Sequence, residues 1–493
     1  MRQQGEWGMV NKIVNKYKQM SLPAKAAIWF TICNFVLKGI SFISGPIFTR
    51  VLSTDEYGLQ SIFLSYEQLI LIIATWEIQL GAYTKGLFKY RDDVDLYTTS
   101  TQALVNLLTI VCFAFIFLFN NFVTKVTKMQ LPILVLLFIY LLVRPSYNFW
   151  LNRKRKAYDY KASVSITLLY SVVNVVLPIG ALLFLRKTAN VKFGATLIGS
   201  TIICIIFYFR YANYWILPKQ WEKVKSYWKY NITFEGPLVL HSLSYLVLSQ
   251  ADRVMISNMV GNSQAAFYSV AYSIAGVVSI FQSSVNQALQ PWRYQMLEQK
   301  NYSSIRRVTN GLLIGFSGLI IAFVIVVPEF MKILFTSDYM ESIWCIPPIA
   351  AGIYFMFLYT IFVNVEEYFE KTKYVVYVSV VCGVVNILLN YVCIQIFGYI
   401  ACAYTTLFSY MLFAVGHYIF MKKTLVSNSV RESVVDIKAI AIISACLTGA
   451  SIIITSLYNA PLVRYGLLLV IFIVAVINNK KIKYLYSQLK KGR

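Results

Sequence analysis

Polar and charged side chains occur inside segments that are otherwise apolar, and four of them lie on two consecutive segments. In the first segment, Asn34, Lys38 and Ser41 follow a helical spacing that places them on one face. In the second, Glu67 lies at a matching depth. Because ionisable groups are costly in hydrocarbon, Lys38 and Glu67 should neutralise each other. The pair is either static or opens when an anionic ligand competes for the lysine.

Three further basic residues lie within or at the ends of apolar segments. Arg144 precedes Pro145 and either extends toward the headgroups or lines a cavity. Arg50 and Arg253 lie near the outer ends of their segments. Each either anchors its helix at the interface or binds an anion there. An anion such as phosphate would suit arginine, since a guanidinium binds phosphate through two parallel hydrogen bonds.

Acidic residues and one histidine are candidates for gating or ion coupling. Asp252 lies beside Arg253, and Glu77 and Glu235 lie near the predicted cytoplasmic boundary. These two glutamates are alternatively ordinary solvated carboxylates. His241 is either a satisfied group of the core or a proton carrier, since its charge changes near neutral pH.

Catalytic and metal-binding patterns are missing from the sequence. The eight cysteines form no CxxC pair and no Cys/His cluster, so neither a metal site nor a disulfide framework is indicated. There is no GxSxG and no GxxxxGK[ST] motif. We therefore expect a protein that is not an enzyme, has no cofactor, and draws energy from an ion gradient, the membrane potential or the substrate's own gradient.

The elements that position these residues follow from composition. The chain has 493 residues, of which 58% are hydrophobic and 13% charged, and its mean hydropathy is +0.62. Soluble domains carry about 25% charged residues. Runs of about 20 apolar residues, the length of a membrane-spanning helix, follow one another closely. The sequence predicts an all-α polytopic membrane protein with about fourteen spans, of which the twelfth covers 400–420 and the fourteenth 461–478.

The net charge of +24 reflects topology rather than nucleic-acid binding. Most of the 45 lysines and arginines fall in alternate connecting segments, as the positive-inside rule requires. This pattern predicts a multi-pass protein with both termini in the cytoplasm. Near the N-terminus, Val10, Ile13, Val14 and Tyr17 share a helical face, which indicates either a short interfacial helix or a basic tail.

A weak internal repeat divides the chain. SVVNVVLPIG around Asn174 resembles GVVNILLNYV around Asn386, and the same shift moves the first span onto the seventh. Two six-helix bundles with a site at their interface are a recurring transporter architecture. The predicted parts are an N-terminal segment (1–25), an N-lobe (26–213), a linker (214–233), a C-lobe (234–420), a linker (421–436), two further helices (437–479) and a basic tail (480–493).

Three stretches resemble one family. GPIFTRVLSTDEYGLQSIFLSY (45–66), SQADRVMISNMVGNSQAAFYSVAYSIA (249–275) and GVVNILLNYVCIQIFGYIACAYTTLFSY (383–410) resemble bacterial polysaccharide repeat-unit flippases, the Wzx-type branch of the MATE/MOP exporter superfamily. The likeness extends over essentially the whole chain. It departs at Ala401-Cys402-Ala403, where the family has Gly-Ala-Ala.

The resemblance implies a V-shaped fold of two lobes around a cationic cavity that opens alternately to each side. Its implied substrate is an oligosaccharide on a polyprenyl pyrophosphate (undecaprenyl pyrophosphate is the expected carrier), flipped from the inner to the outer leaflet of the bacterial cytoplasmic membrane. Lys38 and Arg144 would then hold the pyrophosphate, Arg50 or Arg253 would engage it on the outward side, and Asn34 and Ser41 would line the binding face. Implied partners are membrane lipid and the polymerase and chain-length proteins of polysaccharide biosynthesis.

Competing interpretations remain open. A cation-coupled drug or metabolite antiporter of the same superfamily would favour a carboxylate-lined cavity, whereas the buried lysine and arginines favour an anionic ligand. A polysaccharide polymerase or glycosyltransferase would need a sizeable outer catalytic loop, and the outer loops here are short. A scramblase is a further alternative.

Overall fold

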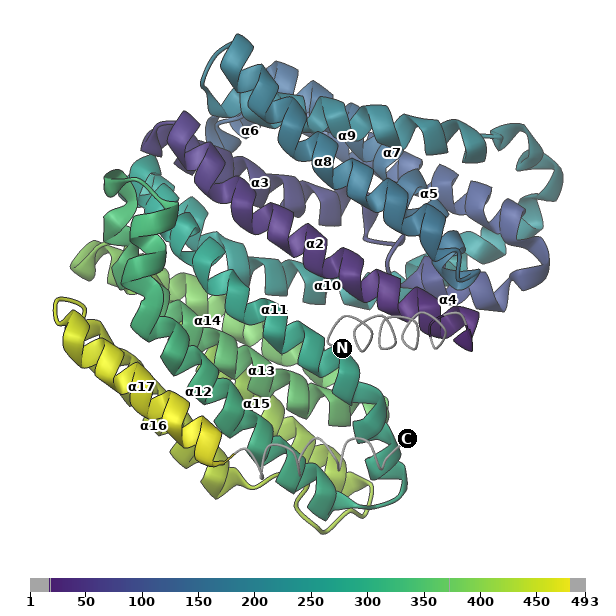
Figure 1. Ribbon diagram of the computed structural model, residues 1–493. Helices are drawn as coiled ribbons and strands as arrows, with labels where there is room; N and C mark the ends of the chain where they lie inside the picture. Colours follow the sequence, from purple (N-terminus) through teal and green to yellow (C-terminus); the bar gives the residue numbers. More distant parts are fainter. Residues whose placement is uncertain (1–16, 18, 372, 479–493) are drawn as a thin grey trace, which may run out of the picture. The chain divides into compact units, whose positions relative to one another are not determined.

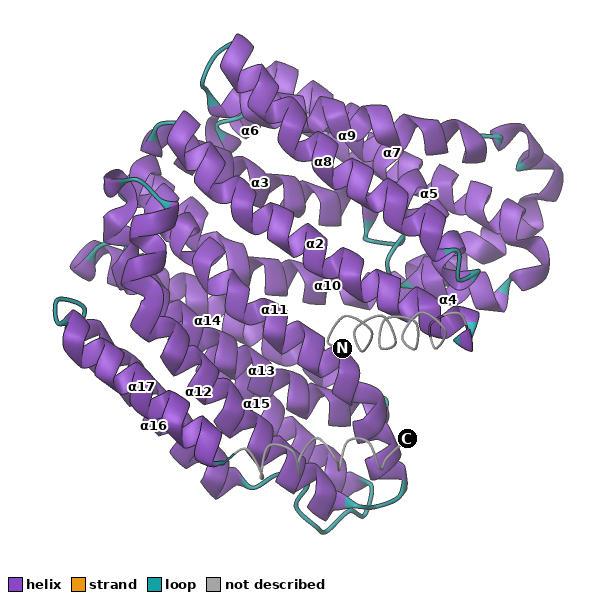
Figure 2. Ribbon diagram, in the orientation of Figure 1, coloured by secondary structure: helices purple, strands orange, loops and turns teal. Residues whose placement is uncertain are grey.

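The computed structural model describes residue 17 and residues 19–371 and 373–478, and its regular elements there are all helices (Figure 2). The predicted residues Val10, Ile13 and Val14 and the basic tail lie outside the described residues. The elements are α2 (Leu22–Val51), α3 (Thr54–Thr75), α4 (Ala82–Lys89), η1 (Arg91–Asp93), α5 (Val94–Leu118), α6 (Asn120–Thr127), α7 (Leu131–Lys156), α8 (Tyr160–Phe184), α9 (Ala189–Tyr211), η2 (Tyr214–Ile216), η3 (Pro218–Gln220), α10 (Trp221–Met259), α11 (Asn262–Glu298), α12 (Tyr302–Leu334), η4 (Ser337–Trp344), α13 (Ile346–Tyr368), α14 (Lys373–Phe397), α15 (Ala401–Ser427), α16 (Ile437–Ser456) and α17 (Pro461–Ile477).

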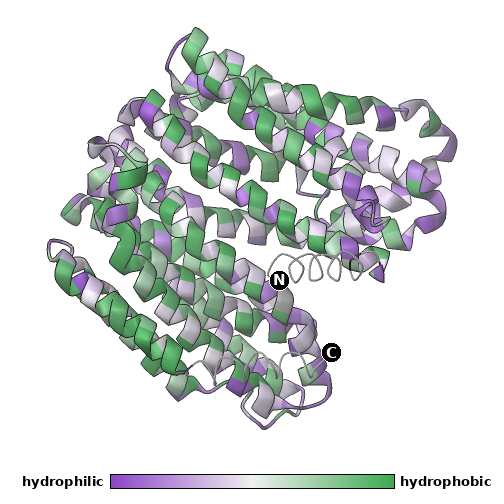
Figure 3. Cartoon of the chain, in the orientation of Figure 1, coloured by the Kyte–Doolittle hydropathy of each residue, from purple (hydrophilic) through white to green (hydrophobic). Residues whose placement is uncertain are grey.

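Twelve helices of the described residues are long and apolar enough to cross a membrane, and apolar residues dominate their ribbons in Figure 3. Two of the fourteen expected spans fall outside this set. The fourteenth is the shorter apolar helix Pro461–Val474. The twelfth lies in α15, which has the length of a span but mixes threonine, serine and histidine with its apolar residues. These polar side chains are buried against other helices of the protein rather than placed in lipid.

Several helices begin where the sequence supplies a capping side chain. Asp159, Thr188, Asn301 and Asp436 precede α8, α9, α12 and α16, and each accepts a hydrogen bond from the backbone N–H three residues later. Such a bond satisfies one of the free N–H groups of a helix's first turn. These four polar residues therefore fix where the apolar runs become helical.

The chain divides into two compact units. Unit 1 contains residues 1–44 and 70–239, and unit 2 contains residues 45–69 and 240–493. In unit 1, α9 packs against α7 and α8. In unit 2, α15 packs in the same way against α13 and α14, while α16 and α17 lie along α12 (Figure 1). The predicted lobe boundaries stay a prediction.

One helix–helix contact recurs at equivalent places in the two units. In unit 1, Ser200 Oγ of α9 donates a hydrogen bond to Asn174 Oδ1 of α8 over 2.8 Å. In unit 2, Asn386 Nδ2 of α14 donates to Ser409 Oγ of α15 over 3.2 Å. Asn174 and Asn386 are the residues that align in the sequence repeat, so the contacts support a shared helix arrangement.

Candidate functional site

The polar face of α2 carries an exposed charge, Lys38, inside a predicted span. Asn34, Lys38 and Ser41 are exposed, and Lys38 lies about 24 Å along the helix from Leu22 at 1.5 Å per residue. Among the described residues of unit 1, no acidic side chain forms an ion pair with Lys38. Glu67 belongs to unit 2, so its predicted pairing with Lys38 stays a prediction.

Arg144 points along α7 away from the predicted cytoplasmic end. Its guanidinium carbon lies 5.4 Å from the centre of the Tyr140 ring, one helical turn toward the N-terminus of α7. The Tyr140 hydroxyl is in turn hydrogen-bonded to that of Tyr170 on α8, at 3.0 Å. This direction argues against extension to the inner headgroups and places the cation among the tyrosines of unit 1.

The two arginines predicted at the outer ends have different surroundings in unit 2. Arg50 is exposed, and its Nη2 donates to the backbone oxygen of Ile333 at 3.3 Å. Arg253 is only 9% exposed. Its guanidinium carbon lies 4.5 Å from the centre of the Tyr272 ring, and Nη1 donates to the backbone oxygen of Ser249 at 2.9 Å. Arg253 is therefore held by a ring and by its own helix rather than extended to the interface.

Asp252 is the centre of a buried polar network. Its Oδ1 accepts from Asn390 Nδ2 at 2.6 Å and its Oδ2 from Thr406 Oγ1 at 2.8 Å and from the Tyr268 hydroxyl. Asp252 is 0% exposed. A fully buried carboxylate needs such donors, because an unpaired charge in low dielectric is strongly unfavourable. The network joins α10, α11, α14 and α15 within unit 2.

Glu235 is not a solvated carboxylate, contrary to one of the two expectations. It is 3% exposed, and its Oε1 accepts from the backbone N–H of Ala82 at the start of α4. A Cβ at Gly81 would lie 2.2 Å from that oxygen, so a larger residue there would displace the carboxylate from its present position. A carboxylate at a helix N-terminus is favoured by the free N–H groups and the dipole there.

Glu77 and His241 make local contacts. Glu77 is half-buried in the turn between α3 and α4, where its φ is +51°, and its backbone N–H donates to Thr75 Oγ1 at 3.2 Å. His241 Nδ1 is hydrogen-bonded to Ser379 Oγ of α14 at 2.8 Å. The contact of His241 is the one expected of a satisfied core histidine.

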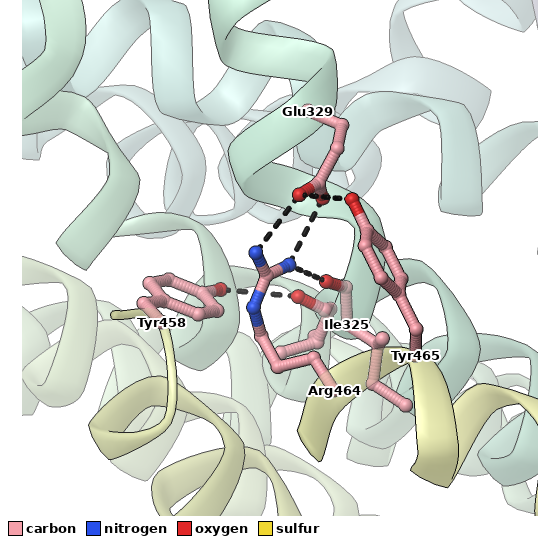
Figure 4. A network of polar contacts seen from close by, with 6 residues as sticks. Ile325, Glu329, Tyr458, Arg464 and Tyr465 are labelled. Carbon is pink, nitrogen blue, oxygen red and sulfur yellow. Dashed lines mark hydrogen bonds and ion pairs between the residues drawn. The ribbon is translucent and has the colours of Figure 1, made fainter. Parts of the chain in front are cut away.

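Sequence reasoning missed two pairs of ionisable side chains that the fold brings together in unit 2. His417 Nδ1 of α15 and Glu366 Oε1 of α13 lie 3.0 Å apart, and both side chains are fully buried. Arg464 of α17 holds Glu329 of α12 through two hydrogen bonds of 2.8 and 2.9 Å (Figure 4). Figure 4 also shows Tyr465 donating to Glu329, at 2.8 Å. All four residues lie near the end of a predicted span. Ionisable residues are common there, so their presence in the sequence does not indicate a functional site.

The fold and its polar residues can now be set beside known proteins. A family model described as polysaccharide biosynthesis protein matches residues 24–297, which is more than half of the chain. The chain belongs to this family. A second model, described as MatE, matches residues 237–392. The chain is thus a membrane transporter of the polysaccharide-biosynthesis type in the MATE/MOP superfamily, which confirms the family predicted from its sequence.

Individual relatives are distant in sequence. Protein 1 of the Lsg locus of Haemophilus influenzae is 21% identical over 377 residues, which cover 74% of this chain and 89% of that protein. The lipid II flippase MurJ in an inward closed conformation aligns with a TM-score of 0.63 at 13% identity, covering 92% of this chain and all of that one. An inward-facing multidrug resistance MATE transporter aligns with a TM-score of 0.62 at 11% identity, covering 82% and 100%. These likenesses show a MATE/MurJ-type fold and confirm the predicted fold class.

Proposed function

We propose that this polysaccharide-biosynthesis transporter flips an oligosaccharide linked to a polyprenyl pyrophosphate. Movement runs from the inner to the outer leaflet of a bacterial cytoplasmic membrane, by alternating access. The family match supports the transporter class, and the distribution of basic residues supports an orientation with both termini in the cytoplasm. In this proposal the protein is a carrier without catalytic steps.

The observation that carries the proposal is the ammonium of Lys38. It is exposed in the middle of an apolar helix, where a charged group is costly unless it meets water or a counter-charge. Asn34 and Ser41 on the same face supply polar groups beside it. A transported pyrophosphate would supply a counter-charge, and the sugars attached to it would hydrogen-bond to the polar face.

The remaining arginines have supporting roles in the proposal. Arg50 and Arg253, both in unit 2, would engage the pyrophosphate in the outward-facing state. Arg144 lies beside tyrosine rings of unit 1 and would contribute positive potential rather than direct contact. A guanidinium over an aromatic ring keeps its full charge while its apolar faces are shielded.

An apolar groove in unit 2 suits the lipid tail. It has a volume of about 530 Å3 between α13, α15 and α16. Its lining is mainly hydrocarbon and aromatic, including Phe355, Phe362, Met411, Val415, Ile440 and Ala441. An isoprenoid chain has matching chemistry, so we propose this groove as a place for a polyprenyl tail.

Asp252 is the strongest candidate for coupling to an ion. It is a buried carboxylate whose hydrogen-bond donors are neutral hydroxyl and amide groups. It can therefore bind a proton or a small cation without breaking an ion pair with any of these donors. Glu67, Glu77, Glu235 and His241 stay proposals for gating. Polymerase and chain-length proteins are the partners that would take up the flipped product.

The test is substrate choice in reconstituted vesicles. The full chain would be given a fluorescent polyprenyl-pyrophosphate oligosaccharide, and its exposure to an outer-leaflet quencher would be followed, with a cationic dye in parallel vesicles. Flipping of the lipid-linked sugar without dye transport supports the proposal. Ion-driven dye transport with a stationary lipid-linked sugar would overturn it in favour of the antiporter, the alternative that the Asp252 carboxylate and the MATE-type fold favour.

A further inference from the structure

Unit 1 contains a polar cavity of about 310 Å3 between α2, α7 and α8. It takes in one predicted site residue, Asn34, and one that sequence reasoning missed, Arg155. Its lining residues are Phe30, Cys33, Asn34, Arg155, Ser163, Val164 and Thr167. No acidic side chain is among them, so the cavity has a positive charge and suits an anionic ligand.

Arg155 differs from its three basic neighbours in the run Arg153–Lys156. Arg153 pairs with Asp95 at 2.7 Å and Lys154 with Asp159 at 2.7 Å. The Lys154 ammonium holds the pKa of the Asp159 carboxyl below its usual value, so that pair is fully charged at neutral pH.

The fourth member of the run, Lys156, donates to the backbone oxygen of Leu87. Arg155 instead faces the cavity. Within the described part of the chain it makes neither an ion pair nor a hydrogen bond, and its guanidinium carbon lies 5.9 Å from the ring centre of Phe30. Three of the four cations therefore stabilise the fold, and the fourth is left to a ligand.

The groups around Arg155 match a phosphate in number and kind. The guanidinium can present two parallel N–H groups to a phosphate, and the exposed Asn34 amide adds N–H donors. The hydroxyls of Ser163 and Thr167 now donate to backbone oxygens of α8 and its cap, at 2.8 and 2.7 Å. Hydroxyls rotate readily, so they can turn toward a bound oxyanion.

From the predicted ends of the fourth and fifth spans, we expect the cavity to lie at the level of a lipid headgroup. Arg155 is the second-last residue of α7, and Ser163 is in the first turn of α8. Close by, the rings of Trp29 and Tyr160 stack with their centres 6.3 Å apart, and Trp and Tyr concentrate where membrane meets water. Asn34 also lies one helical turn from Lys38, so the cavity borders the polar face of α2.

We propose that this cavity binds the pyrophosphate of the lipid-linked substrate at the membrane surface, before it reaches Lys38. The inference rests on the proposed function and adds a separate loading site to it. The recognised chemistry is a phosphate ester on a lipid. That chemistry is shared with ordinary anionic phospholipids, and the experiment separates the two.

The experiment measures equilibrium binding, which does not require transport. The full chain, purified in a neutral detergent, is titrated with geranylgeranyl pyrophosphate and separately with phosphatidylglycerol, in wild type and in a Lys38→Ala background that removes the second cation. We expect Arg155→Gln to weaken binding of the pyrophosphate lipid about tenfold in both backgrounds, the loss typical of one charged, two-pronged hydrogen-bonded contact. The matched control is Arg186→Gln, which removes an exposed arginine just beyond the opposite end of α8.

Three results would overturn the inference. The first is that Arg155→Gln binds the pyrophosphate lipid as tightly as wild type. The second is that Arg186→Gln weakens binding as much as Arg155→Gln, which would indicate bulk electrostatics. The third is equal affinity for phosphatidylglycerol, which would assign the cavity to ordinary lipid. Failure of the proposed function looks different: vesicles would not flip the oligosaccharide lipid, while the Arg155-dependent binding of pyrophosphate would remain.

Discussion

Arg464 in unit 2 and Arg155 in unit 1 both lie in terminal turns of membrane helices, but their surroundings are opposite. Arg464 is 2% exposed and has Glu329, Tyr465 and a backbone oxygen around it. Arg155 is exposed and faces a polar cavity. A guanidinium whose two Nη groups bind a carboxylate and a backbone oxygen fixes two helices to each other. A guanidinium without such partners, like that of Arg155, keeps both its positive charge and its N–H donors available to bind an anion.

The two units also differ in the surroundings of their polar residues. Both contain the Asn–Ser contact of the repeat, but in unit 2 the asparagine continues through Asn390 to the buried Asp252, whereas in unit 1 the contact stands among apolar residues of α8 and α9. Unit 1 exposes Lys38 and Arg155 on or beside the polar face of α2, whereas the Asp252 carboxylate of unit 2 is fully buried among neutral donors. We infer that Lys38 and Arg155 of unit 1 bind the anionic substrate first, and that Asp252 of unit 2 takes the coupling ion.

The largest loss of stability is expected from Arg464→Ala. It leaves Glu329 without its ion pair and frees α17 from α12, at a cost of about 3 kcal/mol. This value is at the lower end of the free-energy cost of breaking a buried ion pair, because the Glu329 side chain is 31% exposed and water partly solvates it. Unfolding by sodium dodecyl sulfate in mixed micelles measures the change. Tyr465→Phe is the control, with an expected loss of about 0.5 kcal/mol; equal losses in the two variants would show that the ion pair does not lock α17.

Asp252→Ala comes next. It removes the acceptor from three buried donors, Tyr268, Asn390 and Thr406, and should cost about 2 kcal/mol. Asp252→Asn preserves shape and an acceptor oxygen, so it should fold with a smaller loss and yet transport without dependence on an ion gradient. The measurement is flipping with and without imposed sodium and proton gradients. An Asp252→Asn protein that keeps wild-type gradient dependence would remove the coupling role from unit 2.

A smaller effect tests the repeat itself. Ser200→Ala and Ser409→Ala remove equivalent hydrogen bonds between helices, each worth about 0.6 kcal/mol in a membrane protein. Ser409→Ala should cost somewhat more, because Asn386 is fully buried and Asn174 is not. Both values come from the same unfolding titration. Opposite signs for the two variants would contradict an equivalent packing role.

The smallest change in stability is expected from Arg155→Gln. Since Arg155 has no ion pair among the described residues, its replacement should alter the unfolding free energy by less than about 0.5 kcal/mol. A loss comparable to that of Arg464→Ala would mean that Arg155 is structural, and the contrast between the two arginines would fail.

Much of the fold follows from local patterns in the sequence. Long apolar runs predict spanning helices, side chains such as Asp159 and Asp436 cap them, and the Asn174 and Asn386 segments predict a repeat whose contacts the structure shares. The number of spans was harder to predict. The run in α15 contains Thr405, Thr406 and His417, which bind partners inside the protein, so its composition is not that of a helix facing lipid.

The site was predictable only where a charge stands out against hydrocarbon. Lys38 and Arg144 became candidates because an ionisable group within an apolar run is costly, and Asp252 became one because it lies beside Arg253. Arg155 and Arg464 were missed because charges at helix ends are ordinary. Which of them is paired and which is not depends on partners far away in the chain, such as Glu329, and this information exists only in three dimensions.

The most direct test of the account is the flipping rate of Lys38 variants in reconstituted vesicles, measured with the fluorescent polyprenyl-pyrophosphate oligosaccharide. Loss of a charged contact to the transported group should slow Lys38→Ala by about a hundredfold, equivalent to about 2.7 kcal/mol. Lys38→Arg, which keeps the charge, should stay within about tenfold of wild type. A Lys38→Ala protein that is normally folded and flips at the wild-type rate would contradict the central claim that the polar face of α2 holds the substrate's pyrophosphate.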